Sequence, residues 1–272
     1  MKALVFAAGL GTRLRPLTDH MPKAMVPVAG KPLLGHVMER LTEGLGPCLT
    51  EAVVNVHHFP DQIISYLSSR DWGIPVKVSD ERDFLRDTGG GLLYAEPLLR
   101  PSEAERILIH NVDILSNLDF GWFCEQAPMD ALATLVVSDR PTKRYFLFQE
   151  EPDPAGTASR LRLVGWTNIE TGEVRTPFPD LDASSCLRLA FAGIHLVSPR
   201  IFDAFRALGF VPASDGKPVK FSITDFYLAA CARHPIYGIV PAGFRMMDVG
   251  KVDTLAAAED FLGSACRETD GE

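Results

Sequence analysis

Residues 2–13 read K-A-L-V-F-A-A-G-L-G-T-R, a short apolar run that leads into a loop with two glycines and an arginine. An apolar run of this length that ends in glycine is typical of a central strand buried on both faces of a parallel sheet. Gly9 and Gly11 allow the backbone to approach a ligand closely and expose N–H groups that can bind phosphate oxygens. The stretch therefore predicts a central strand followed by an anion-binding loop.

The loop extends from Gly9 to Pro32 and is basic in an otherwise acidic chain. The 272 residues carry a net charge of −8, whereas residues 1–31 hold five basic side chains against a single acidic one. Arg13 offers a planar fork suited to phosphate, and Lys23, in a P-K-x-x-x-P context, offers a compact point charge. The acidic balance argues against non-specific binding to nucleic acid, and the local basic excess predicts a site for a small anion.

A dinucleotide-binding loop of the dehydrogenase type also contains G-x-G, but the surrounding residues argue against it here. That motif requires a third small residue where this chain has Leu14, and an immediate helix, which Pro16 and Pro22 prevent. The acidic residue that binds ribose about 20 positions further on is missing, because residues 27–29 are P-V-A. We therefore exclude an oxidoreductase that uses a nicotinamide cofactor.

Beyond the loop, apolar strand patterns alternate with amphipathic helix patterns. This alternation predicts a Rossmann-like three-layer α/β fold, in which helices cover both faces of a mostly parallel, mixed central sheet. Such sheets bind ligands at the carboxyl ends of their strands, where the Gly9 loop and residues 111–113 fall. We expect strands at residues 2–8, 51–56, 75–79, 106–110, 131–137 and 187–197, and helices at residues 33–45, 60–69, 89–98, 226–232 and 252–263.

The segment from residue 141 to residue 185 departs from this alternation. It is richer in turn residues, with short alternating pieces and a turn at residues 170–173, and so predicts a small β-rich excursion. Ser222 and Asp225 resemble a capping box before the helix at residues 226–232.

The cysteine pattern and the hydropathy indicate where the chain is located. Five scattered cysteines without C-x-x-C spacing fit reduced, mostly buried thiols better than a disulfide framework or a zinc site. No apolar stretch reaches the roughly 18 residues that a transmembrane helix needs. The apolar run at the N-terminus is also too short for a signal peptide. We expect a cytoplasmic protein that does not insert into a membrane.

The run from Ala7 to Val28 resembles the signature of the sugar-1-phosphate nucleotidyltransferases. Later motifs of that family also look present, in the same order: Asp87-Thr88-Gly89-Gly90-Gly91, Asn111-Val112-Asp113, Phe191-Ala192-Gly193-Ile194 and Met247-Asp248-Val249-Gly250. The resemblance spans most of residues 2–262 and is nearest to the short bacterial enzymes that act on hexose or muramic acid 1-phosphates. It implies one domain, residues 1–272, with a nucleotide-binding half (1–140) and a sugar-phosphate-binding half (141–272).

The resemblance implies transfer of a nucleotidyl group from a nucleoside triphosphate to a sugar 1-phosphate, with release of pyrophosphate. The attacking phosphate oxygen is already ionised at neutral pH, so the reaction needs no general base. Catalysis then depends on positioning and on neutralisation of negative charge. We accordingly expect His57, His58 and His110 to be structural. The expected partners are these two small substrates, without nucleic acid or membrane, and the chain is expected to be a monomer or a small homo-oligomer.

The same resemblance implies a role for individual residues. Arg13 and the backbone of residues 9–12 would hold the leaving end of the triphosphate, and Lys23 would stabilise charge on the α-phosphate. Asp113 and Asp248 would hold Mg²⁺, a hard ion that prefers carboxylate and phosphate oxygens. The implied nucleotide site consists of Ala8, Gly9, Gly11, Thr12, Arg13, Lys23, Thr88 and Gly89. The implied sugar-phosphate site consists of Asn111, Asp139, Gly193 and Lys220.

Two other functions stay open at this point. Cytidylyltransferases that act on phosphocholine or another alcohol phosphate resemble the same loop, and a choline-type acceptor favours an aromatic cage. The candidates for such a cage are Trp122, Tyr145, Phe146, Phe148 and Trp166. A non-catalytic, nucleotide-sensing regulatory subunit of the same fold should have lost Arg13, Lys23 or a metal-binding aspartate, and this chain keeps all of them. The base and the sugar are left open by the sequence.

Overall fold

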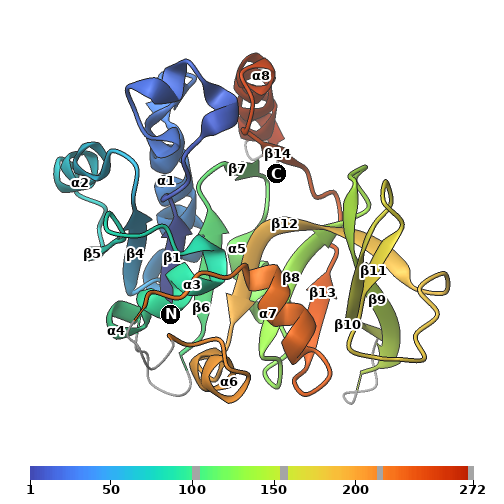
Figure 1. Ribbon diagram of the computed structural model, residues 1–272. Coiled ribbons are helices and arrows are strands. Elements are labelled where there is room, and N and C mark those ends of the chain that lie inside the picture. Colours follow the sequence, from blue (N-terminus) through green and yellow to red (C-terminus); the bar gives the residue numbers. More distant parts are fainter. Residues whose placement is uncertain (100–104, 154–158, 213–216, 269–272) are drawn as a thin grey trace.

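A computed structural model describes residues 1–99, 105–153, 159–212 and 217–268. A ten-stranded mixed sheet runs through the molecule with helices on both of its faces, which confirms the predicted three-layer α/β fold (Figure 1). Its strand order is β11 (Glu173–Arg175), β10 (Ser159–Asn168), β13 (Ile236–Ile239), β8 (Ala133–Ser138), β12 (Leu187–Val197), β6 (Ile107–Asn111), β1 (Lys2–Phe6), β4 (Glu51–Val56) and β5 (Val76–Asp80). A tenth strand, β9 (Arg144–Pro152), pairs with both β10 and β12.

Strand β1 occupies the centre of the parallel part of the sheet, as predicted. It pairs in parallel with β4 on one side and β6 on the other, and β5 continues the parallel pairing beyond β4. Phe6, the last residue of β1, is in register with Asn55 and with Asn111. The carboxyl ends of these strands therefore meet at one edge of the sheet, and the residues that follow them are brought together there.

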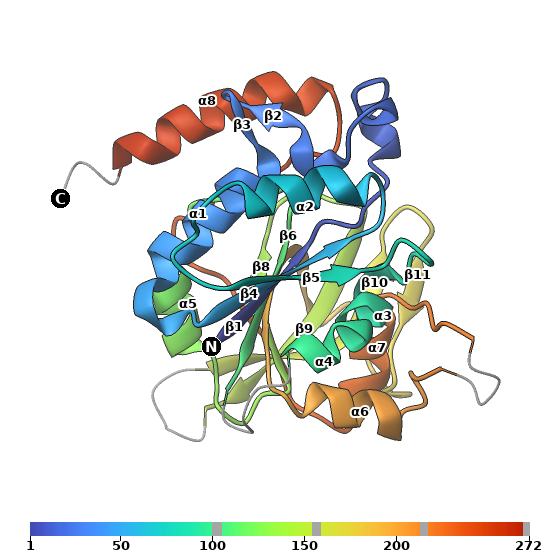
Figure 2. The same cartoon turned by 90° about the vertical axis from the view of Figure 1, so that its left-hand side faces the viewer.

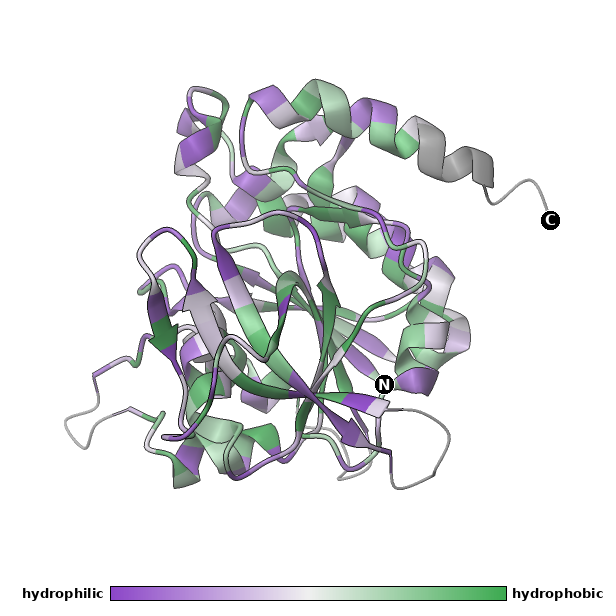
Figure 3. Ribbon diagram, turned by 90° about the vertical axis from the view of Figure 1, so that its right-hand side faces the viewer, coloured by the Kyte–Doolittle hydropathy of each residue, from purple (hydrophilic) through white to green (hydrophobic). Residues whose placement is uncertain are grey.

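Each face of the sheet carries its own hydrophobic core. On one face, α1 (Leu33–Leu45), α2 (Pro60–Ser68) and α5 (Phe120–Gln126) pack against alternate residues of β1 such as Ala3 and Val5. On the other face, α3 (Asp87–Tyr94), α4 (Glu96–Leu99), α6 (Ile201–Ala207) and α7 (Ile223–Ala230) pack against Leu4 and Phe6. Figure 2 shows the two sets of helices on opposite sides of the sheet, and Figure 3 shows hydrophobic residues concentrated in the central strands.

The basic loop contains short elements that the sequence did not predict. These are the 3-10 turns η1 (Thr12–Leu14), η2 (Leu17–Asp19) and η3 (Lys23–Met25), and the hairpin of β2 (Pro27–Val28) and β3 (Lys31–Pro32). A third hydrophobic cluster joins Leu14 and Val28 of the loop to Ala258 of the C-terminal helix α8 (Asp253–Glu268). The loop is thus held between α8 and the body of the fold (Figure 2).

The segment 141–185 forms strands, as predicted, but these strands belong to the main sheet. Strand β9 pairs antiparallel with β12, and β10 pairs antiparallel with β13. Among the described strands of this sheet, parallel pairing joins β5-β4-β1-β6 and β8 with β13, and the strands around β12 are antiparallel. The sheet is therefore mixed, as predicted, but not mostly parallel, because the strands of segment 141–185 add antiparallel pairs. The predicted turn at residues 170–173 joins β10 to β11, where the N–H of Gly172 donates to the carbonyl of Asn168 (2.9 Å).

Two predicted helices differ in detail from the structure. The helix expected at residues 89–98 is divided into α3 and α4, because Pro97 lacks the N–H that would continue the hydrogen-bond ladder. Helix α7 begins at Ile223, where the Ser222 hydroxyl accepts a bond from the N–H of Thr224 (3.2 Å). The predicted reciprocal half of the capping box is wrong, since the Asp225 carboxylate binds Arg175 instead (2.7 Å).

The prediction of mostly buried thiols is confirmed for the cysteine side chains that the structure describes. Cys124, Cys186 and Cys231 are buried and Cys48 is exposed, all four as free thiols, and the side chain of Cys266 lies outside the described residues. Within the described ranges, every helix is too short or too polar to cross a membrane.

Candidate active site

A cavity of about 460 Å³ opens at the carboxyl edge of the parallel strands. Each of the four strands places a residue in its wall, namely Ala8 after β1, Asn55 in β4, Glu81 after β5 and Asn111 in β6. Most of the residues that the family resemblance selected also line it: Ala8, Gly9, Gly11, Thr12, Arg13, Lys23, Thr88, Asn111, Asp113 and Lys220.

The glycine-rich loop adopts a shape that requires glycine at residue 11. Gly11 has a φ of +63°, and a Cβ on it would lie 2.8 Å from the methyl group of Thr18. The carbonyl of Gly11 accepts bonds from the Thr18 hydroxyl (2.8 Å) and from the N–H of Leu14 (2.8 Å). By contrast, a Cβ on Gly9 would meet no atom within 4 Å, so this part of the loop borders open space in the cavity.

Charged side chains from distant parts of the sequence meet at one rim of the cavity. Lys23, only 8% exposed, forms an ion pair with Asp113, the second residue after β6. Asp248 ends β14 (Met246–Asp248), which pairs with β7 (Ile114–Ser116), and the N–H of Val249 donates to the carbonyl of Asp113 (2.8 Å). Sheet pairing thus places the two aspartates side by side, with Asp113 among the residues that line the cavity and Asp248 just outside that set.

Gly250 allows Arg13 to approach this pair of aspartates. A Cβ on Gly250 would lie 2.6 Å from Oδ1 of Asp248 and 2.7 Å from Nη2 of Arg13. The guanidinium and the carboxylate therefore converge on the space that the missing side chain leaves. Arg13, Lys23, Asp113 and Asp248 occupy one region, as the sequence predicted.

The two aspartates repel each other electrostatically. Although Asp248 is exposed on one side, desolvation by the surrounding protein raises the pKa of its carboxyl, and the negative charge of Asp113 raises it further. Lys23 and Arg13 act in the opposite direction, because positive charge favours the ionised carboxylate. A cation bound between the two carboxylates would relieve the repulsion.

The donor set decides which cation fits. Within the described part of the chain, no cluster of three or more His, Cys, Asp or Glu side chains could enclose a metal ion. Two carboxylates alone suit a hard ion that completes its coordination with water and substrate phosphates, as Mg²⁺ does. The residues present therefore fit Mg²⁺ and do not fit a structural zinc site, which takes four protein ligands.

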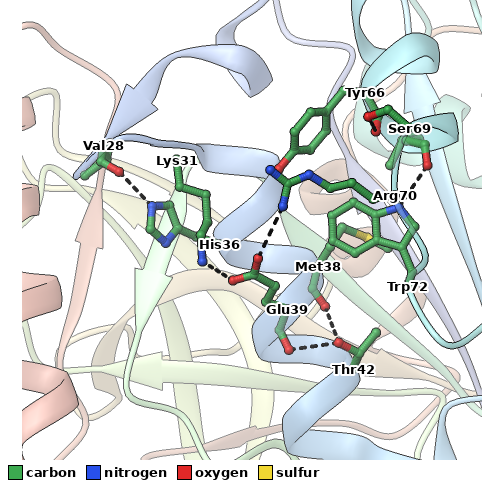
Figure 4. A network of polar contacts seen from close by, with 11 residues as sticks. Val28, Lys31, His36, Met38, Glu39, Thr42, Tyr66, Ser69, Arg70 and Trp72 are labelled. Carbon is green, nitrogen blue, oxygen red and sulfur yellow. Dashed lines mark hydrogen bonds and ion pairs between the residues drawn. The ribbon is translucent and has the colours of Figure 1, made fainter.

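Other basic residues of the loop have structural partners outside the cavity. Lys31 pairs with Glu39 of α1, and Arg70 lies 3.8 Å from the same carboxylate and 4.8 Å above the ring of Tyr66 (Figure 4). This network connects the end of the loop to α1 and α2. Arg15 forms an exposed ion pair with Asp19 (3.3 Å). Exposed pairs of this kind contribute at most about 1 kcal/mol each.

Three predicted acceptor residues lie at different distances from the cavity. Lys220 lines it, whereas Gly193 supports it from behind: at a φ of +75°, its missing Cβ would lie 2.6 Å from Nδ2 of Asn111. Gly193 falls where the pairing of β12 with β8 shifts register between Phe191 and His195. Asp139 is exposed and lies outside the set of lining residues, so its role stays a prediction.

Gly89 also lies outside the lining set, and packing accounts for it. A Cβ on Gly89 would lie 2.2 Å from the ring of Phe221, and the N–H of Gly89 donates to the Phe221 carbonyl (3.0 Å). The glycine therefore allows α3 to pack closely against the segment that leads into α7. Its predicted contact with the base stays a prediction.

We expect Gly89→Ala to lower the free energy of unfolding by about 1–3 kcal/mol, because the added methyl group would overlap the ring of Phe221. Urea unfolding would measure the change. Gly263→Ala is the matched control: Gly263 is an exposed glycine of α8 with no atom within 4 Å of an added Cβ, so its stability should stay equal or rise. Equal stability of both variants and the unmodified protein would contradict the packing explanation.

Asn55 and Glu81 also line the cavity, although neither was predicted from the sequence. They lie between the start of the glycine-rich loop and α3. The Asn55 amide bonds the backbone at the start of the loop, and Glu81 is fully buried beside it. Burial raises the pKa of Glu81, against hydrogen bonds from Asn55 and from the N–H of Arg86. The signal for Asn55 was a polar side chain near the carboxyl end of an apolar strand, and Glu81 directly follows the more polar strand β5.

The histidines expected to be structural are each in contact with a backbone carbonyl. Burial lowers the pKa of His110 to about 4, so its ring is neutral at physiological pH. The contacts are His57 Nδ1 with Glu81 O (2.7 Å), His58 Nε2 with Thr18 O (3.2 Å) and His110 Nδ1 with Asn111 O (2.8 Å).

Comparisons with known proteins identify the family and several relatives of the chain. The family model described as nucleotidyl transferase matches residues 2–160. The N-acetylmuramate alpha-1-phosphate uridylyltransferase of Caulobacter vibrioides is 32% identical over 271 residues, which cover 97% of each chain. A probable mannose-1-phosphate guanylyltransferase of Oryza sativa subsp. japonica is 33% identical over 92% of this chain and 62% of its own length.

Solved structures show the same fold at lower identity. The crystal structure of a putative glucose-1-phosphate thymidylyltransferase from Bacillus anthracis superposes with a TM-score of 0.71 and 18% identity, over 96% of this chain and 94% of that one. A UDP-glucose pyrophosphorylase complexed with UDP-glucose superposes with a TM-score of 0.68 and 16% identity. These structures show the shared fold, and the family model with the sequence relatives identifies the chain as a member of the nucleotidyl transferase family.

Proposed function

We propose that this chain transfers a nucleotidyl group from a nucleoside triphosphate to a sugar 1-phosphate, giving a nucleoside diphosphate sugar and pyrophosphate. The observation that carries the proposal is the convergence of Arg13, Lys23 and Asp113, which line the cavity, with Asp248, which lies beside them. Such an arrangement of two cations and two carboxylates suits a reaction between phosphates. Relatives named as uridylyltransferases and guanylyltransferases of sugar 1-phosphates support the same reaction.

The site offers positioning and charge neutralisation for an in-line displacement. A phosphate oxygen of the acceptor forms a bond to the α-phosphorus, and the bond from that phosphorus to the bridging oxygen of the β-phosphate breaks, so that pyrophosphate leaves with the electron pair. Lys23 stabilises the charge on the α-phosphate, and Arg13 with the N–H groups of residues 9–12 holds the leaving pyrophosphate. Asp113 and Asp248 offer oxygen ligands for Mg²⁺, which supplies further neutralisation when bound.

A choline-type acceptor receives no support from the aromatic residues. Among the described residues that line the cavity, Phe6 is the sole aromatic side chain. Phe146 and Phe148 are buried in the hydrophobic core. Trp122 belongs to α5, which packs on the same face of the sheet as α1 and α2. The aromatic cage that would favour phosphocholine is therefore not formed at the cavity.

The proposal is tested by a panel of substrates. Purified protein with Mg²⁺ is mixed with UTP, GTP, CTP, dTTP or ATP and with N-acetylmuramic acid, mannose or glucose 1-phosphate, or with phosphocholine, and pyrophosphate release is measured. We expect release that requires both substrates. UTP with N-acetylmuramic acid 1-phosphate should be the fastest pair, because the uridylyltransferase relative matches this chain over nearly its whole length. No release from any pair would favour the regulatory subunit.

A further inference from the structure

A buried hydrogen-bond relay connects the start of the nucleotide loop to strand β5. The side-chain oxygen of Asn55 accepts the N–H groups of Ala7 (2.7 Å) and Ala8 (3.1 Å). The side-chain nitrogen of Asn55 donates to Oε1 of Glu81 (2.8 Å), and Oε2 of Glu81 accepts the N–H of Arg86 (3.2 Å). Three strands and the loop before α3 are thus joined through two side chains.

The chemistry of the pair fixes which way the Asn55 amide points. The backbone N–H groups of Ala7 and Ala8 can only donate, so the amide oxygen of Asn55 has to face them. The NH₂ group of the amide then faces Glu81, whose two carboxyl oxygens both accept hydrogen bonds. Asn55 is 3% exposed and Glu81 is fully buried, so water cannot replace a lost bond at either residue.

Glu81 borders the cavity but has no exposed surface, so its neighbours screen its carboxyl group from a ligand. Gly91 of α3 leaves the space for it, because a Cβ there would lie 2.9 Å from Oε1 of Glu81 and 3.3 Å from Nδ2 of Asn55. Glu81 therefore acts through its hydrogen-bond partners, and on the side of Asn55 this path leads to the backbone of Ala7 and Ala8.

We infer that Asn55 and Glu81 are positioning residues for the nucleoside triphosphate. Glu81 orients the Asn55 amide, and Asn55 holds the two peptide N–H groups from which the loop of residues 9–12 departs. Because this loop shapes the nucleotide side of the cavity, loss of the relay should weaken nucleotide binding and leave acceptor binding nearly unchanged. This inference rests on the proposed function.

The relay can be broken and rebuilt by exchanging its donor and acceptor. Asn55→Asp places a carboxylate oxygen against Glu81, and Glu81→Gln presents an NH₂ group to one of the two donors that Glu81 now accepts. Each single variant should raise the KM for the triphosphate by about 10- to 100-fold. In the double variant, the introduced glutamine donates to the introduced aspartate and still accepts from Arg86, so the KM should return to within a few-fold of the original.

The measurements separate positioning from general stability. For each variant we would determine the KM of both substrates, kcat, the affinity for the triphosphate by direct titration, and the melting temperature. Asn168→Asp, at the distant end of β10, is the control for the charge change and should leave both KM values unchanged. Single variants that lose melting temperature but keep the triphosphate KM would overturn the inference, as would a double variant no better than the worse single one.

Failure of the proposed function would give a different set of results from failure of the relay. If the unmodified protein released no pyrophosphate from any substrate pair, the function would be rejected and the relay would still be tested by the titrations. Normal turnover by the unmodified protein, with equal triphosphate affinity in all variants, would reject the relay alone.

Discussion

Lys23→Ala should lower kcat by about 10²- to 10³-fold, the loss that follows removal of one preorganised electrostatic donor from an active site. Lys23 is only 8% exposed, lines the cavity and faces Asp113, so its charge acts where water is largely excluded. A charge in such surroundings interacts with phosphate more strongly than a charge on an open surface. Steady-state pyrophosphate release at saturating substrates would measure the loss.

A stability measurement has to accompany this variant. Removing Lys23 leaves Asp113 without its ion-pair partner, which destabilises a protein strongly when the remaining charge is buried. The Asp113 side chain keeps 22% of its surface exposed, so water can solvate it and the fold should survive. Lys31→Ala is the control, because Lys31 belongs to the same loop but pairs with Glu39 away from the cavity. Turnover of Lys23→Ala within threefold of that control would refute the role of Lys23.

Local pattern was sufficient to locate much of the fold. The helix at residues 33–45 and the strands at residues 51–56 and 187–197 were predicted to the residue, because apolar spacing and flanking turn residues mark their ends. The strands of segment 141–185 were expected, but their partners were not. Pairing of β9 with β12 and of β10 with β13 joins residues far apart in the sequence, and no local pattern records it.

The contrast between local pattern and long-range pairing also applies to the candidate active site. The loop around Gly11 and the aspartates carry recognisable motifs, and the structure brings them together in and beside one cavity. Asn55 and Glu81 could not be ranked above other polar residues, because their importance depends on the register of β1, β4 and β5. Gly89 shows a second limit of the motif: it predicts contact with a ligand, but close packing against the ring of Phe221 requires a glycine at this position as well.

Asp248→Asn should raise the Mg²⁺ concentration needed for half-maximal activity by more than about 10-fold and should lower kcat at low Mg²⁺. The variant removes the negative charge of one of two adjacent carboxylates and keeps a side chain of the same shape that still forms hydrogen bonds. Asp248 is a better choice than Asp113 for this test, because Asp113 also binds Lys23 and its loss would change two features at once. Asp203→Asn, at an exposed position of α6, is the matched control and should leave the Mg²⁺ dependence unchanged.

The Mg²⁺ titration also separates two explanations of a loss in activity. If Asp248 binds the ion, the defect of Asp248→Asn should shrink as Mg²⁺ rises, because mass action refills a weakened site. If Asp248 instead only holds the nearby Arg13, whose guanidinium converges with it on Gly250, the defect should be the same at every Mg²⁺ concentration. A constant defect would therefore reject Asp248 as a metal ligand and assign it to the arginine, because more Mg²⁺ cannot restore a misplaced guanidinium.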